Sequence, residues 1–91
     1  MAGSALLNEV MAEHPAKSLA LAKKNLDDAN GEMILDFSHV PGVDVEALSA
    51  LLDLAGLAET KKVKLILRGV NVDVYKVLKL MKLASRFSYL D

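Results

Sequence analysis

The sequence predicts an α/β fold in which a small mixed or parallel sheet is covered by helices, in the order strand, helix, strand, helix. Two short apolar runs of strand length, Glu32–Phe37 and Val63–Gly69, are each followed by a segment with helical periodicity. Strands that alternate with helices pair in parallel through right-handed crossovers. The 91 residues are 53% hydrophobic and 4% aromatic, which predicts a single domain over residues 1–91 with an aliphatic core.

The amino-terminal region is expected to contain one helix. Pro15 suits the first turn of a helix, and the residues AKSLALAKKNLDD that follow place Leu19 and Leu26 on one side. The pair Asn30-Gly31 is a turn signal that ends this helix. The residues before Pro15 fit a strand as well as a further helical turn, and their periodicity does not separate the two, so residues 1–14 stay open.

The segment EMILDF, Glu32–Phe37, is a continuous apolar run and predicts a strand buried on both faces. Pro41-Gly42 indicates a loop, after which Asp44 is expected to cap a helix that begins at Val45. This helix has a polar face and an opposite side that is expected to face the core. The polar face comprises Glu46, Ser49, Asp53, Gly56 and Thr60, and the core side comprises Leu48, Leu51, Leu52 and Ala55.

The carboxy-terminal part predicts a second interior strand, a helix and a short edge strand. The segment VKLILRG alternates and then becomes apolar, which is typical of an interior strand that Gly69 closes. Asn71 is expected to cap the helix VDVYKVLKLMKLAS, residues 72–85. The apolar face of that helix comprises Val74, Val77, Leu78 and Met81. The final residues FSYLD predict a short edge strand.

Composition argues against several classes of protein. The chain has no cysteine, which excludes disulfides, thiolate metal sites and a cysteine nucleophile. Its apolar runs are far shorter than the roughly 20 residues of a membrane span. No basic segment precedes the first apolar stretch, so the amino terminus does not resemble a secretory signal. We therefore expect a cytoplasmic protein without membrane insertion.

Charge is divided unevenly along the chain, although the net charge is −1. Residues 1–60 contain ten acidic and three basic residues, whereas residues 61–91 contain two acidic and eight basic residues. Lys76, Lys79 and Lys82 spread around a helix instead of forming a stripe, and no aromatic residues alternate with them as stacking platforms. We expect no nucleic-acid partner.

No residue pattern indicates catalysis, a cofactor or a metal. Asp36, His39 and Asp44 lie near one strand-to-loop junction, but a lone loop histidine near two acids is usually a surface residue and not a zinc ligand. Asp44 and Glu46 fall in the first turn of a helix, where the helix dipole stabilises carboxylates. That position explains both acids without acid–base chemistry, and we expect a protein that is not an enzyme.

One feature of the helix that begins at Val45 suggests a binding surface. On a helical wheel, Ala50, Leu54 and Leu57 lie beside the polar face and outside the core sector. Apolar side chains at the edge of a polar face are usual in protein-binding surfaces. A neighbouring loop or the amino-terminal segment would cover them equally well, so both interpretations remain open.

The stretch LDFSHVPGVDVEALSALL, Leu35–Leu52, resembles without gaps the signature of the STAS domain, the fold shared by sulphate transporters and anti-sigma factor antagonists. The matching residues are Asp36, Ser38, Val40, Asp44 and Leu48. GVNVDVYKVLKLMKL, residues 69–83, is similar to the last strand exit and helix of the family. The resemblance covers about residues 31–89 and implies a STAS-like α/β fold. Most STAS domains open with a β-hairpin, but the fourteen residues before Pro15 leave room for one strand or none.

The resemblance also implies a function. In antagonists of this kind, a kinase-like anti-sigma factor phosphorylates a serine or threonine just after the conserved Asp, and the phosphate blocks binding. Here those positions hold Val45 and Glu46, and Ala47 replaces the family's glycine. Glu46 therefore lies at the phosphorylation-equivalent position, with about one negative charge where a phosphate carries −1.5 to −2. Ser49 is the nearest hydroxyl.

The leading hypothesis is a non-enzymatic module that binds a protein partner, an anti-sigma factor antagonist that lacks the phosphorylated residue. The expected partner-binding residues are Pro41, Gly42, Asp44, Val45, Glu46, Ser49, Ala50, Asp53, Leu54 and Leu57. A second hypothesis is a STAS subunit of a phospholipid-transport ABC complex, whose partner is the transporter ATPase. A third, of another class, is a regulatory domain that binds a nucleotide or anion at the helix amino terminus, against which Glu46 adds negative charge.

Overall fold

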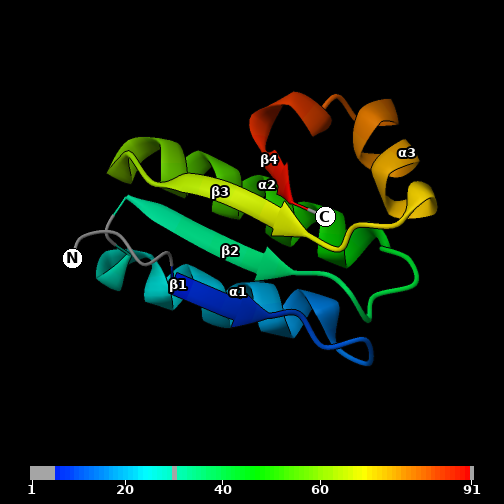
Figure 1. The fold of residues 1–91 in the computed structure, drawn as a ribbon, viewed down its shortest axis with the longest axis horizontal. Coiled ribbons are helices and arrows are strands. Elements are labelled where there is room, and N and C mark those ends of the chain that lie inside the picture. Colours follow the sequence, from blue (N-terminus) through cyan, green and yellow to red (C-terminus); the bar gives the residue numbers. More distant parts are fainter. Residues whose placement is uncertain (1–5, 30, 91) are drawn as a thin grey trace.

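The structure is a computed structural model that describes residues 6–29 and 31–90. Within these residues four strands alternate with three α-helices (Figure 1). In chain order the elements are β1 (Leu6–Glu9), α1 (Pro15–Asn25), β2 (Glu32–Asp36), α2 (Val45–Lys61), β3 (Lys64–Arg68), α3 (Val72–Leu80) and β4 (Ser88–Leu90). Two short 3₁₀ helices, η1 (Leu26–Asp28) and η2 (Ala84–Arg86), follow α1 and precede β4. The α/β prediction and the order of its elements are confirmed.

The four strands form one sheet in the order β1-β2-β3-β4, and every neighbouring pair is parallel. The predicted interior strand β3 and edge strand β4 are therefore confirmed. The sheet also resolves the open question before Pro15, because residues 6–9 form a strand that pairs with β2. Residues 1–5 lie outside the described residues.

Helix α1 forms as the sequence predicts. Pro15 stands in the first turn and Leu19 is buried, and α1 ends at Asn25, where η1 continues the helical path and buries Leu26. The Ser18 hydroxyl donates to the His14 carbonyl at 3.1 Å and accepts from the backbone N–H of Met11 at 3.0 Å, which ties the start of the helix to the end of β1. We predicted a turn at Asn30-Gly31, and Asn30 lies outside the described residues.

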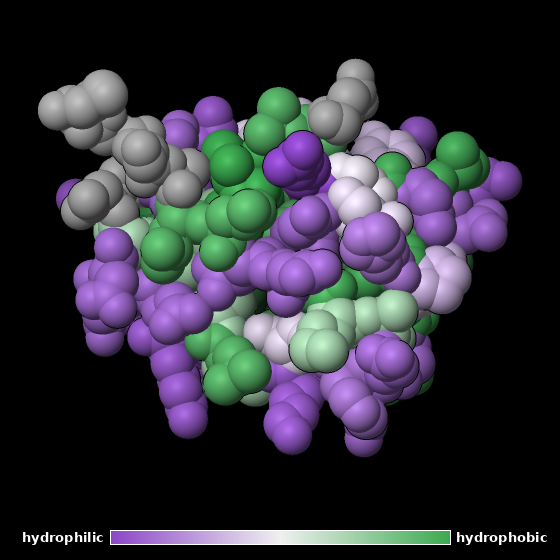
Figure 2. Space-filling view, turned by 60° about the horizontal axis from the view of Figure 1, so that its bottom comes forward, coloured by the Kyte–Doolittle hydropathy of each residue, from purple (hydrophilic) through white to green (hydrophobic). Residues whose placement is uncertain are grey.

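The expectation that β2 is buried on both faces is wrong. Met33 and Leu35 are fully buried, whereas Ile34 between them is only half-buried. The reason is that α1 and α2 pack against each other behind the same face of the sheet (Figure 1). The other face, which we call the open face, is covered by no helix of residues 6–29 and 31–90. It lies toward the top of Figure 2, where hydrophobic side chains lie among hydrophilic ones.

The last helix is shorter than predicted, because α3 ends at Leu80 and not at Ser85. Lys82 adopts a left-handed conformation with φ of 61°, and the Leu83 N–H donates to the Leu78 carbonyl at 2.8 Å. This pairing across a left-handed residue is the usual way in which a helix closes. It buries Leu83 and leaves Met81 exposed, so the prediction that Met81 faces the core is also wrong.

Among the described residues, no helix combines the length and the apolar character that crossing a membrane requires.

Candidate partner-binding site

The candidate site forms where β2 and β3 end at the same edge of the sheet. The segments that leave these two strands are in close contact, since the Phe37 N–H donates to the Arg68 carbonyl at 2.7 Å. Gly69 follows β3 with a φ of 70°, and a Cβ atom placed there would lie 2.4 Å from Ser38 Oγ. The lack of a side chain at Gly69 therefore allows the two loops to approach each other.

Asp36 fixes the start of the loop after β2. Its Oδ1 accepts from the backbone N–H of Ser38 at 2.9 Å and also from the Ser38 hydroxyl. This is the local turn that aspartate commonly makes with the residue two positions later. The Ser38 hydroxyl, followed by the Ser38 N–H, lowers the pKa of the Asp36 carboxyl, with smaller contributions from Arg68 and His39. Asp36 is therefore a structural acid, which is stabilised in its charged form.

Asp44 caps α2, as the sequence predicts. Its backbone is extended, with φ of −98° and ψ of −176°, and its Oδ1 accepts from the Ala47 N–H at 2.8 Å. The next two side chains project into solvent: Val45 is 80% exposed, and Glu46 is exposed in the first helical turn. The amino terminus of α2 thus presents an apolar side chain beside a carboxylate.

Asn71 connects the loop after β2 to α3. Its Oδ1 accepts from the Val74 N–H at 2.8 Å and caps α3, as predicted. Its Nδ2 lies 3.3 Å from the Val40 carbonyl and 3.2 Å from the Pro41 carbonyl and donates to both. The sequence analysis missed this second role, although Asn71 lies three residues after the end of β3 and parallel strands bring their carboxyl ends to one edge of a sheet.

An apolar groove runs beside the exposed amino-terminal half of α2. It has a volume of about 350 Å³ and is lined by Val45, Leu48, Ser49, Leu52, Met81 and Leu83. The first four lie on one stripe of α2, and the last two come from the residues that follow α3. Leu52 is 47% exposed here, so the prediction that Leu52 faces the core is wrong.

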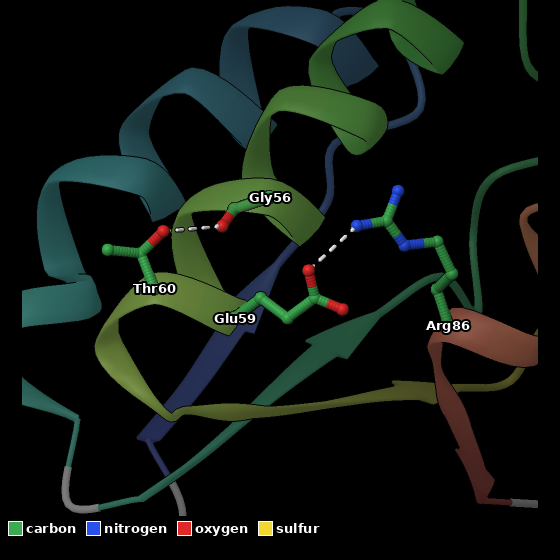
Figure 3. A network of polar contacts seen from close by, with 4 residues as sticks. All are labelled: Gly56, Glu59, Thr60 and Arg86. Atoms are coloured by element: carbon green, nitrogen blue, oxygen red, sulfur yellow. Dashed lines mark hydrogen bonds and ion pairs between the residues drawn. The ribbon is translucent and has the colours of Figure 1, made fainter.

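The segment that follows α3 is fixed to the carboxy-terminal half of α2 (Figure 3). Arg86 Nη2 in η2 lies 3.3 Å from Glu59 Oε1, and the neighbouring Thr60 hydroxyl donates to the Gly56 carbonyl at 3.2 Å. Both partners of the ion pair are solvent-accessible, so its contribution to stability is small. Its position nevertheless ties η2, and with it the chain that leaves the groove, to α2.

The expected binding surface on the other side of α2 needs correction. Leu54, expected to be exposed, is 0% exposed, and Ala50 and Leu57 are half-buried and pack against the core. Lys61 lies on the same stripe of α2 and forms an ion pair with Asp27 of η1, so this stripe faces α1. The interpretation in which a neighbouring segment covers these side chains is thus the correct one, and Leu54 cannot contact a partner.

The other expected partner-binding residues remain accessible: Pro41, Gly42, Asp44, Val45, Glu46, Ser49 and Asp53. Asp36, His39 and Asp44 do not assemble into a metal site, because the described part of the chain contains no group of three or more His, Cys, Asp or Glu side chains that could hold an ion. The site therefore consists of a capped helix start, two joined loops and an apolar groove.

Comparisons with known proteins agree with this architecture. The model of the STAS domain family matches residues 7–89. Among solved structures, a candidate anti-sigma factor antagonist from Thermotoga maritima superposes with a TM-score of 0.68 at 21% sequence identity. The match covers 100% of this chain and 75% of that one, and at this identity it shows a shared fold. No match is found among curated proteins.

Proposed function

This chain belongs to the STAS domain family, and we propose that it is a non-enzymatic module that binds a protein partner through the amino terminus of α2 and the adjacent apolar groove. The observation that carries the proposal is this juxtaposition: Val45 and Leu52 are exposed on one stripe of α2 and line a groove whose other wall includes Met81. Exposed aliphatic side chains around a concave surface are what a buried interface core requires.

The acids at the site support binding better than catalysis. Asp44 is engaged as the helix cap, and Asp36 is engaged with Ser38. Glu46 stands in a first helical turn, where the helix dipole favours its charge. A general acid or base needs a pKa near the working pH and a cleft to shield the reaction, whereas the turn with Ser38 lowers the pKa of Asp36 and holds its carboxyl in the charged form.

We propose a kinase-like anti-sigma factor as the first class of partner, because the solved structure that shares this fold is described as a candidate anti-sigma factor antagonist, and the antagonists that the sequence resembles bind partners of that kind. In this account Glu46 supplies a fixed charge at the phosphorylation-equivalent position, and no phosphatase can remove it. The affinity of the complex would then not be switched at this position, and a basic side chain of the partner would face Glu46.

A phospholipid-transport ATPase is the second class of partner. The observation that favours it is the absence of a hydroxyl at Val45 and Glu46 together with an intact apolar groove, since a permanently assembled subunit needs a docking surface and no phosphoswitch. The nucleotide hypothesis is the least supported. Asp44 already accepts from the Ala47 N–H, and Glu46 adds a second negative charge to the same helix start.

Affinity capture from the protein's own cells, followed by mass spectrometry, tests the proposal. The tagged chain is compared with Leu52→Asp in the groove and with Leu21→Asp on α1, since Leu21 is also exposed, at 54%. We expect one protein to copurify with the wild type and Leu21→Asp and to be lost with Leu52→Asp. The identity of that protein then distinguishes an anti-sigma factor from a transporter ATPase. A partner captured equally by all three chains would contradict the proposed surface.

A further inference from the structure

The open face of the sheet carries a regular pattern of charge on its two central strands. On β2 the side chains on this face are Glu32, Ile34 and Asp36, and on β3 they are Lys64, Ile66 and Arg68. The parallel register sets Glu32 beside Lys64 and Asp36 beside Arg68, with the two isoleucines between them. One strand therefore presents acid, isoleucine, acid, and its neighbour presents base, isoleucine, base at the same levels.

Glu32, Lys64 and Arg68 form no ion pair with another described side chain, whereas Asp36 already accepts two hydrogen bonds from Ser38. The ion pairs among the described side chains join Lys61 to Asp27 and Arg86 to Glu59, and neither lies on the open face. On the edge strands this face carries Leu7 and Glu9 of β1 and Ser88 and Leu90 of β4. Leu7 is 53% exposed and Leu90 is 46% exposed, and the exposed Glu9 stands beside Asp36. The open face is thus partly apolar and carries available charges of both signs.

We propose that the open face pairs with the open face of a second copy of this chain, around a two-fold axis that runs parallel to the strands between β2 and β3. Such an axis exchanges the positions of β2 and β3 and preserves the level along the strand. Glu32 of one copy then faces Lys64 of the other, Asp36 faces Arg68, and Ile34 faces Ile66. The pattern is self-complementary only because acids and bases occupy the same levels.

The dimensions of the molecule allow this contact and limit its strength. Facing sheets pack about 10 Å apart, a distance that glutamate and lysine side chains span together. The molecule measures 35 × 22 × 22 Å along its principal axes, so the contact through one face is no larger than the ~800 Å² per partner of a standard interface. The contact is therefore small, and we expect a transient dimer.

Charge complementation tests the proposal, because each single reversal makes the face repel itself while the two reversed chains together match again. In sedimentation equilibrium, Lys64→Glu and Glu32→Lys alone should each weaken dimerisation at least about tenfold, since like charges would face each other twice. An equimolar mixture of the two should form a heterodimer with affinity close to that of the wild type. Lys24→Glu, on an exposed position of α1, is the matched control and should leave the affinity unchanged.

Other outcomes would overturn the inference. A wild type that sediments as a monomer at its highest soluble concentration excludes the dimer. A dimer that Lys64→Glu leaves intact forms through another face. The mixed chains could also stay monomeric while circular dichroism shows that both are folded. In that case the acids of β2 and the bases of β3 only stabilise the sheet of one chain as cross-strand pairs, and they do not mediate a dimer.

Discussion

The side-chain amide of Asn71 donates a hydrogen bond to the carbonyl of Pro41 across 3.2 Å, and so links the start of α3 to the loop that leads into α2. The same side chain caps α3 through its oxygen. One residue therefore sets the position of both segments that border the candidate site.

Asn71 variants separate these two roles. Asn71→Ala removes the cap and the link, and we expect it to lower the free energy of unfolding by about 1 kcal/mol or somewhat more in urea titrations. Asn71→Asp keeps a capping oxygen but has no N–H to donate. We expect it to retain most of the stability while hydrogen exchange in residues 38–43 becomes faster. Unchanged exchange in that loop would show that the contact with Pro41 does not hold it.

Gly69 and Gly56 should respond to alanine in opposite directions. At Gly69 the new Cβ would lie 2.4 Å from Ser38 Oγ and 2.9 Å from Ser38 Cα, in a left-handed conformation. We expect Gly69→Ala to destabilise the fold by about 1–3 kcal/mol. At Gly56, inside α2, the Cβ meets nothing within 4 Å, so Gly56→Ala should stabilise by about 0.5–1 kcal/mol. Equal melting temperatures for the two variants would refute this account of the loop contact.

Asp36 makes stability depend on acid pH. Because folding lowers the pKa of its carboxyl, the folded state favours the charged form. This stabilisation is fully present above the ordinary pKa of 3.8 and is lost as the pH falls through the lower pKa of the folded state. Ser38→Ala removes the largest cause and should move the Asp36 pKa upward, toward 3.8, in a carbon-13 NMR titration. A pKa that stays where it is in the variant would place the cause elsewhere.

Glu46 should define a latent phosphorylation site if the captured partner is a kinase-like anti-sigma factor. Glu46→Ser restores a hydroxyl at an exposed position in the first turn of α2. We expect the purified kinase to transfer phosphate to Glu46→Ser and to Glu46→Ser with Ser49→Ala, but not to the wild type, as measured by intact mass. Labelling of the wild type at Ser49, or an inert Glu46→Ser beside an active kinase, would argue against a phosphate-equivalent role for Glu46.

The fold could be predicted because its signals are local. The apolar runs at β2 and β3, the caps at Asp44 and Asn71 and the helix start at Pro15 each depend on a few adjacent residues. The early end of α3 could not be predicted, because Lys82 takes a left-handed conformation that sequence signals reserve for glycine or asparagine. The left-handed conformation of Lys82 depends on a contact made by the folded chain, because it allows Leu83 to be buried against the core.

The candidate site could be predicted only in part. The exposed start of α2 followed from the cap, but the exposure of Leu52 and the burial of Leu54 depend on which sides of α2 other elements cover. Helix α1 packs against α2, whereas Met81 and Leu83, which follow α3, line the groove on the Leu52 side. A helical wheel contains no information about either neighbour, and the groove itself exists only once α3 is placed.

The most direct test of the account is the dissociation constant of the captured partner for three chains: wild type, Leu52→Ala and Leu21→Ala. Both leucines are about half exposed on helices, so truncating either has a similar effect on folding, and only Leu52 lines the groove. The account predicts that Leu52→Ala raises the dissociation constant about tenfold, or ~1.4 kcal/mol, and that Leu21→Ala leaves it within about twofold. Equal constants for the three chains would contradict partner binding at the groove beside α2.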